Sequence, residues 1–122
     1  MTRNDFFKLC LEDYGTEPDY PFEKDTETAV FRHISNKKWF AIAMRVPLKR
    51  FKADGESIVD VVNVKIPPEM FGSFSENDGV YPAYHMNKAH WVSILIEFAS
   101  DETVDFLLNA SFFVTKSRKK SR

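Results

Sequence analysis

The fold is decided by residues 80–98, VYPAYHMNKAHWVSILIEF. This stretch predicts two extended segments joined by a polar four-residue loop, residues 86–89. In the second segment, residues 90–98, every other side chain is bulky and apolar, which predicts a strand with one buried face. That face comprises Val92, Ile94, Ile96 and Phe98. Side chains that can form hydrogen bonds or titrate crowd around the loop: Tyr84, His85, Asn87, Lys88, His90 and Trp91. We therefore expect a β-hairpin with a chemically rich tip.

The length and composition fit one folded domain. The chain has 122 residues, long enough to bury a core but too short for two domains. Hydrophobic residues make up 43% of it and aromatic residues 15%, with twelve phenylalanines, which argues against a disordered chain. We expect a single domain over residues 1–115, followed by a basic flexible tail over residues 116–122.

The cysteine count and the hydropathy of the chain limit its expected cellular location and the disulfide, metal and membrane sites it can form. The single cysteine, Cys10, excludes an internal disulfide and a multi-cysteine metal site. A reducing, cytoplasmic location is the expectation. No apolar run approaches the roughly 20 residues that a membrane-spanning helix requires, so we expect no membrane partner.

Charge is strongly segregated along the chain, although the formal net charge is only -1. Residues 12–27 carry seven acidic side chains and one basic one. Residues 32–52 carry seven basic side chains and no acidic one, and residues 116–122 carry five more bases. The net charge is therefore a poor guide to what any one surface attracts.

Capping signals predict three helices. Thr2 as N-cap, with Asp5 three residues later, predicts a helix that ends near Tyr14, with Gly15 just beyond it. Two prolines at positions 67 and 68 predict the start of a short middle helix. Ser100 or Asp101 caps a last helix with an apolar stripe.

Three further strands are expected, over residues 29–34, 39–46 and 58–66, the last apolar enough to be central and buried on both faces. In residues 39–46, the bulky alternate positions should form the core face: Phe40, Ile42, Met44 and Val46. The other face carries two alanines between Trp39 and Arg45, which suits either a closely packed helix or a surface that receives a ligand. With the hairpin, this order predicts an α+β fold: a two-layer sandwich of a mainly antiparallel five-stranded sheet with N-terminal, C-terminal and short middle helices.

Five successive blocks resemble the MmcQ/YjbR family: AVFRH, KKWFAI, NVKIPPEMF, YPAYHMNKAHW and DFLLNASFFV. The block from Tyr84 to Trp91 is the most specific of them. The resemblance implies a small α+β domain similar to the double-wing DNA-binding domain of a phage transcription activator. It implies a DNA-binding role by analogy of fold, and it supplies no catalytic residue.

The basic residues are independent support for nucleic-acid binding, because clustered Lys and Arg side chains neutralise phosphates. The predicted contacts lie on one basic hairpin with its exit loop and on the tip of the other hairpin: Lys37, Lys38, Arg45, Lys49, Arg50, Lys52, His85, Asn87, Lys88 and His90. Two alternatives stay open. A basic hairpin can simply be solvated, or the acidic residues 12–27 and the tail can engage a protein partner. The sequence does not fix an oligomeric state.

Catalysis is not expected, and neither is a cofactor. Two histidines, His85 and His90, are too few for a metal site, and no nearby acid has the spacing to complete one. Cys10 lies on the inward face of a predicted helix, where an inert thiol is expected. A metal-dependent hydrolase is therefore the third hypothesis, and a structural role in holding the loop is the simpler one for Tyr84, His85, Asn87 and Trp91.

Overall fold

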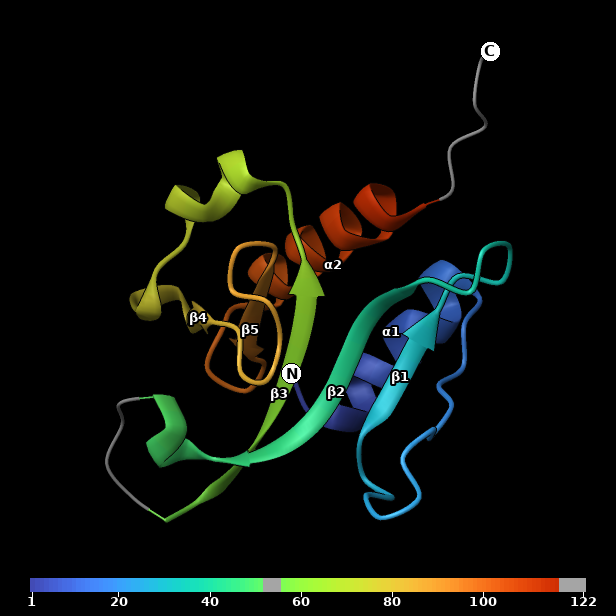
Figure 1. Ribbon diagram of the computed structural model, residues 1–122. Helices are drawn as coiled ribbons and strands as arrows, with labels where there is room; N and C mark the ends of the chain where they lie inside the picture. Colours follow the sequence, from blue (N-terminus) through green and yellow to red (C-terminus); the bar gives the residue numbers. More distant parts are fainter. Residues whose placement is uncertain (52–55, 117–122) are drawn as a thin grey trace.

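The computed structural model describes residues 1–51 and 56–116 (Figure 1). The predicted contact Lys52 and the predicted tail beyond Lys116 lie outside the described residues. The described chain is an α+β structure in which an open five-stranded sheet carries two helices on one face, as predicted.

The sheet has the strand order β1-β2-β3-β5-β4, and every neighbouring pair is antiparallel. The strands are β1 (Ala29–Arg32), β2 (Trp39–Pro47), β3 (Ile58–Lys65), β4 (Val80–Pro82) and β5 (Trp91–Leu95). The central position of β3 is confirmed, because Val61 and Val62 point to opposite faces and both are fully buried.

The two helices are α1 (Arg3–Tyr14) and α2 (Asp101–Thr115). The Thr2 hydroxyl accepts from the Asp5 amide at 3.1 Å while Asp5 accepts from the Thr2 amide at 3.0 Å, which confirms the predicted capping box. The helices bury Phe6, Cys10, Leu107 and Leu108 against one face of the sheet. Burial raises the pKa of the Cys10 thiol, which favours the inert, protonated form.

The predicted middle helix is a pair of 3-10 segments, η2 (Pro68–Ser73) and η3 (Glu76–Asp78), and a third segment, η1 (Leu48–Phe51), follows β2. The opposite face of the sheet carries its own smaller apolar cluster, which consists of Val46, Phe51, Val59, Val61 and Leu95. Residues therefore pack on both faces of the sheet, but only one face is covered by α-helices; we call the other the helix-free face.

The predicted faces of β2 need a correction. Phe31 lies opposite Ala41 and Arg32 opposite Trp39, so Phe40 is an extra residue in β2. This bulge turns Phe40 to the helix side, away from Ile42, Met44 and Val46. The helix-packing alternative holds for Ala41 and Ala43, which lie in the core that α1 and α2 complete. The predicted place of Trp39 on their face is wrong, because the same bulge turns it toward Ile42 and Met44.

The hairpin of residues 80–98 is also shorter in its strands than predicted. Its loop spans residues 83–90, and β5 ends at Leu95, whose carbonyl accepts from the amides of Phe98 and Ala99 at 2.9 Å. Phe98 is consequently 62% exposed, so its predicted place on the buried face is wrong. The chain turns here because Ala99 packs against Gly79, where any Cβ would come within 3.0 Å of the Ala99 backbone.

Candidate nucleic-acid interface

The loop 83–90 is anchored to the sheet by two buried polar side chains. Asn63 on β3 donates to the Tyr84 carbonyl at 2.8 Å, and Ser93 on β5 accepts from the Tyr84 amide at 2.9 Å. Ser93 also donates to the side-chain oxygen of Asn63, and both residues are fully buried. The anchor fixes the base of the loop to the helix-free face of the sheet.

The tip of this loop is held by its own asparagine. The Asn87 side chain accepts from the Ala89 amide at 2.8 Å, and its carbonyl accepts from the amides of His90 and Trp91. A structural role for Asn87 is therefore visible. His85 adopts a φ of 62°, in the left-handed region that residues other than glycine seldom occupy.

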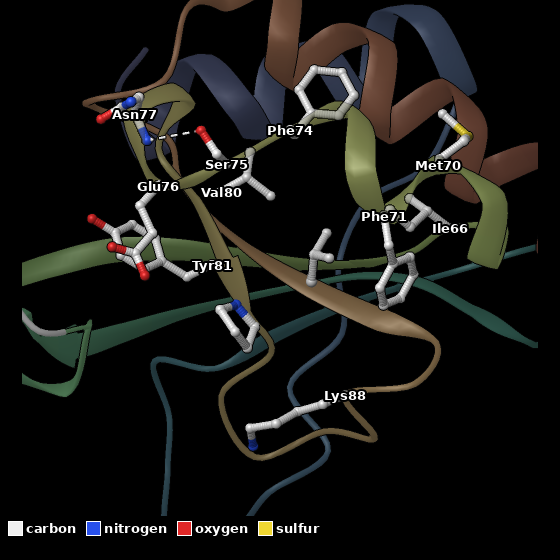
Figure 2. A pocket seen from close by; sticks show the side chains of 12 residues that line it. Ile66, Met70, Phe71, Phe74, Ser75, Glu76, Asn77, Val80, Tyr81 and Lys88 are labelled. Carbon is white, nitrogen blue, oxygen red and sulfur yellow. Dashed lines mark hydrogen bonds between the residues drawn. The ribbon is translucent and has the colours of Figure 1, made fainter.

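Lys88 lies on the far side of the same loop, beside a cavity of about 540 Å³ between the loop and η2 (Figure 2). Met70, Phe71 and Phe74 form most of the apolar wall of this cavity. Lys88 and His85 thus border different hollows, and they do not extend one common basic surface.

The β1–β2 turn carries Lys37 and Lys38 and is tied to the end of α2. The Asn36 side chain donates to the Thr115 carbonyl at 3.1 Å and accepts from the Lys38 amide at 2.8 Å. A second bond, of 2.8 Å, joins His33 Nε2 to the Thr115 hydroxyl. The next residue is Lys116, so two segments that are 79 residues apart in sequence present lysines at one end of the molecule. We call Lys37, Lys38 and Lys116 the turn cluster.

The charges of two lysines of the turn cluster act on His33. Burial lowers the pKa of its imidazole, and the positive charges of Lys116 and Lys38 lower it further, against a raising contribution from its hydrogen bonding. Lys37, Lys38 and Lys116 are exposed, and none of them forms an ion pair within the described residues. The turn cluster is therefore a group of lysines without a direct ion pair among the described residues, and Glu17 and Asp19 line the same hollow as Lys37.

Stability should fall when the pH is lowered below 6.5, the ordinary pKa of histidine. The pKa of His33 is lower in the folded state than in the unfolded state. Between these two pKa values the unfolded state binds more protons, so the free energy of unfolding rises with pH across that window. Urea unfolding at several pH values should show this slope, and a His33→Gln variant should flatten it. An unchanged slope in that variant would assign the effect to other groups.

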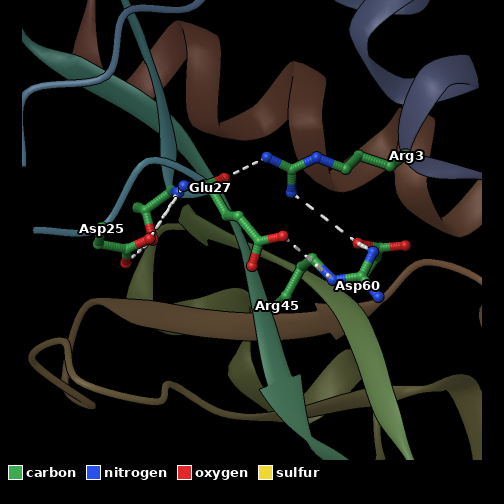
Figure 3. Close-up of polar contacts among 6 residues, drawn as sticks. Arg3, Asp25, Glu27, Arg45 and Asp60 are labelled. Carbon is green, nitrogen blue, oxygen red and sulfur yellow. Dashed lines mark hydrogen bonds and ion pairs between the residues drawn. The ribbon is translucent and has the colours of Figure 1, made fainter.

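Two of the predicted contacts at the other end of β2, Arg45 and Lys49, are paired with acids, and Figure 3 shows the pairs of Arg45. Arg45 Nη1 lies 3.5 Å from Asp60 Oδ1, and its Nε lies 3.9 Å from Glu27 Oε2. Arg3 approaches the same Asp60 oxygen at 3.9 Å and donates to the Glu27 carbonyl. Farther out, Lys49 lies 3.9 Å from Glu56. The acidic segment therefore offsets the charge that Arg45 brings to this end.

The predicted contacts thus fall into three groups. Lys37 and Lys38 lie at one end of β2, and Arg45, Lys49 and Arg50 lie at or beyond the other, across a nine-residue strand that spans about 30 Å. The tip of loop 83–90 forms a third group with His85, Asn87, Lys88 and His90. Sequence reasoning missed the tie from Asn36 to Thr115, for which the only signal is an asparagine in the turn SNKK.

Among residues 1–51 and 56–116, no three His, Cys, Asp or Glu side chains come together in a way that could hold a metal ion. Within the same residues, none of the helices has the length and apolar character needed to span a bilayer.

Comparison with known proteins identifies the family. The sequence profile of the YjbR family matches residues 11–113. The chain belongs to the YjbR family. It is 42% identical over 117 residues to the uncharacterized protein YyaQ of Bacillus subtilis (strain 168), covering 95% of this chain and 99% of YyaQ.

Solved structures share the YjbR fold. A crystal structure of a protein from Pseudomonas syringae superposes with a TM-score of 0.90 at 39% identity, covering 95% of this chain and all of that one. A solution structure from the same organism gives 0.88 at 37% identity, covering 100% and 98% of the two chains. A Deinococcus radiodurans protein, at 23% identity and a TM-score of 0.69, covers 99% of this chain and 83% of that one and shows the fold alone.

Proposed function

We propose that this YjbR protein binds DNA, and that the turn cluster makes its main phosphate contacts. The observation that carries the proposal is the tie between the β1–β2 turn and the end of α2, which fixes the positions from which Lys37, Lys38 and Lys116 project. Phosphate contacts by lysine supply most of the affinity of non-specific DNA binding. The sequence contains four more basic residues beyond Lys116.

The cluster favours contacts with the DNA backbone over contacts with bases. Asn36 is the amide nearest to the lysines, but its side chain is already used by Thr115 and Lys38. Bases are read by side chains that are free to donate and accept at their edges, whereas phosphates need only positive charge. We therefore expect weak sequence preference and strong dependence on salt.

The proposal is tested by fluorescence anisotropy with a labelled duplex at several salt concentrations. The double variant Lys37→Glu/Lys38→Glu should bind at least about tenfold more weakly than wild type, and its salt slope should be smaller by roughly 1.8, since each lost phosphate contact contributes about 0.9. The matched control is Lys49→Glu/Arg50→Glu, which makes the same charge change at the other end of β2. A chain that ends at Lys116 separates the folded cluster from the residues beyond it.

Equal losses of DNA affinity in the two double variants would contradict a special role for the turn cluster. The losses would then follow from the change in net charge alone. Absence of duplex binding by the folded wild-type protein at low salt would overturn DNA binding itself. That outcome would favour the protein-partner alternative. If binding is lost only in the chain that ends at Lys116, the DNA contacts lie beyond Lys116.

A further inference from the structure

The helix-free face of the sheet holds a pocket that the proposed DNA contacts do not use. It has a volume of about 460 Å³, within the range of small-molecule sites, and lies between the acidic segment and loop 83–90. Its floor is the apolar side of β2, with Ile42 and Met44. Met86 and Tyr84 approach from the loop on the other side.

Flat aromatic surfaces line this pocket. Phe22 stands edge-on to Trp39 with 6.2 Å between ring centroids, and Phe22 is 42% exposed on a loop. On the opposite wall, the rings of Tyr84 and His85 lie 3.9 Å apart. Exposed aromatic rings on two sides of a hollow suit a planar ligand, because ring stacking and edge contacts add to the burial of apolar area.

Two charged side chains at the rim, Lys24 and Asp25, differ in how free they are to bind a ligand. Asp25 also lines the pocket, but its carboxylate accepts from the Thr28 hydroxyl and from the Glu27 and Thr28 amides at 3.0 and 3.1 Å. These bonds hold the pKa of Asp25 below its usual range and occupy its oxygens. Lys24 forms no ion pair within the described residues.

Arg45 also borders the pocket, but its guanidinium lies with Asp60 and Glu27, and Asp60 is shared with Arg3 of α1. Among the described residues at the rim, Lys24 is therefore the basic side chain that is free to meet an acid group. The left-handed backbone at His85 is a further sign, since uncommon conformations of this kind concentrate at binding sites.

We propose that this pocket binds a small planar aromatic molecule that carries one acid group. The aromatic part lies between Trp39 and the Tyr84–His85 pair over Met44, and the acid group meets Lys24. This site is separate from the turn cluster and does not depend on DNA binding.

The methionines allow a direct test, because Met44 and Met86 line this pocket, Met70 lines the cavity beside η2, and Met1 lines neither. Naphthalene sulfonate is titrated into protein labelled with ¹³C at the methionine methyl groups. The Met44 and Met86 signals should shift together and saturate, while those of Met70 and Met1 stay in place. Naphthyl methanol, which lacks the acid group, should bind about tenfold more weakly, as expected for loss of a charge-assisted interaction.

Two variants sharpen the test. Lys24→Gln, at an exposed position, should weaken naphthalene sulfonate binding severalfold without affecting naphthyl methanol. Trp39→Leu should weaken both probes, and the matched control Phe71→Leu, in the other cavity, should weaken neither. Shifts that never saturate, shifts centred on Met70, or equal affinity for the acid and the alcohol would each overturn the proposal.

Discussion

Replacing Phe40 by alanine is expected to lower the free energy of unfolding by about 3–5 kcal/mol, the usual cost of deleting a fully buried aromatic ring. The Phe40 side chain has no exposed area and lies at the meeting point of both helices and the sheet. Its ring centroid is 5.0 Å from that of Phe112 on α2, 5.2 Å from His33 and 5.9 Å from Tyr14 on α1. No single neighbour can fill the space that the ring leaves, because each is held by a different element.

Such a loss is a large part of the 5–15 kcal/mol or so that stabilises a typical domain. Thermal unfolding followed by circular dichroism should show a midpoint lower by on the order of 15 °C. Phe98→Ala is the matched control, since its ring is 62% exposed and its removal should cost below about 1 kcal/mol. Similar losses in the two variants would mean that Phe40 is not the centre of the core.

Phe40 and Phe98 also show where the sequence was informative about the fold. Alternation and capping residues were sufficient for the element types, their order and the antiparallel sheet, since these depend on neighbours in sequence. Strict alternation placed Phe40 with Ile42 and Phe98 with Ile96, and both placements were wrong. A bulge and a tight turn end the alternation, and they depend on the partner strand and on Gly79, which the pattern within a single strand does not include.

The candidate site was less predictable, because electrostatics depends on which charges meet in space. The basic run 32–52 looks uniform in sequence, but its two ends lie at opposite ends of β2. At one end, Glu27 and Asp60 lie close to Arg45. At the other end, Asn36 and Thr115 bring Lys116 to Lys37 and Lys38 from 79 residues away. One clue was present in the sequence of β3, IVDVVNVK, where Asn63 interrupts an apolar run. A buried amide in such a run must find partners.

Replacing Asn63 by leucine should cost about 2–4 kcal/mol and release loop 83–90 from the sheet. Leucine has as many side-chain heavy atoms as asparagine and leaves little cavity, but it removes the donor that the Tyr84 carbonyl uses and the acceptor that the Ser93 hydroxyl proton uses. The Ser93 oxygen keeps its bond from the Tyr84 amide. A buried polar atom without a partner costs about 1–3 kcal/mol. The substitution removes the partners of one carbonyl and one hydroxyl proton at once, whereas an Asn4→Leu control, at an exposed position of α1, should change stability by less than about 0.5 kcal/mol.

Hydrogen exchange at the Tyr84 amide distinguishes release of the loop from general loss of stability. This amide donates to Ser93, so Ser93→Ala should speed its exchange even where the amides of β5 stay protected. Because Asn63 and Ser93 share one network, the double variant should lose less stability than the sum of the two single variants, by roughly 1 kcal/mol. Strict additivity would show that each residue supports the loop independently. Protection of Tyr84 in Ser93→Ala would show that contacts other than this network hold the loop, and the pocket beside it, in place.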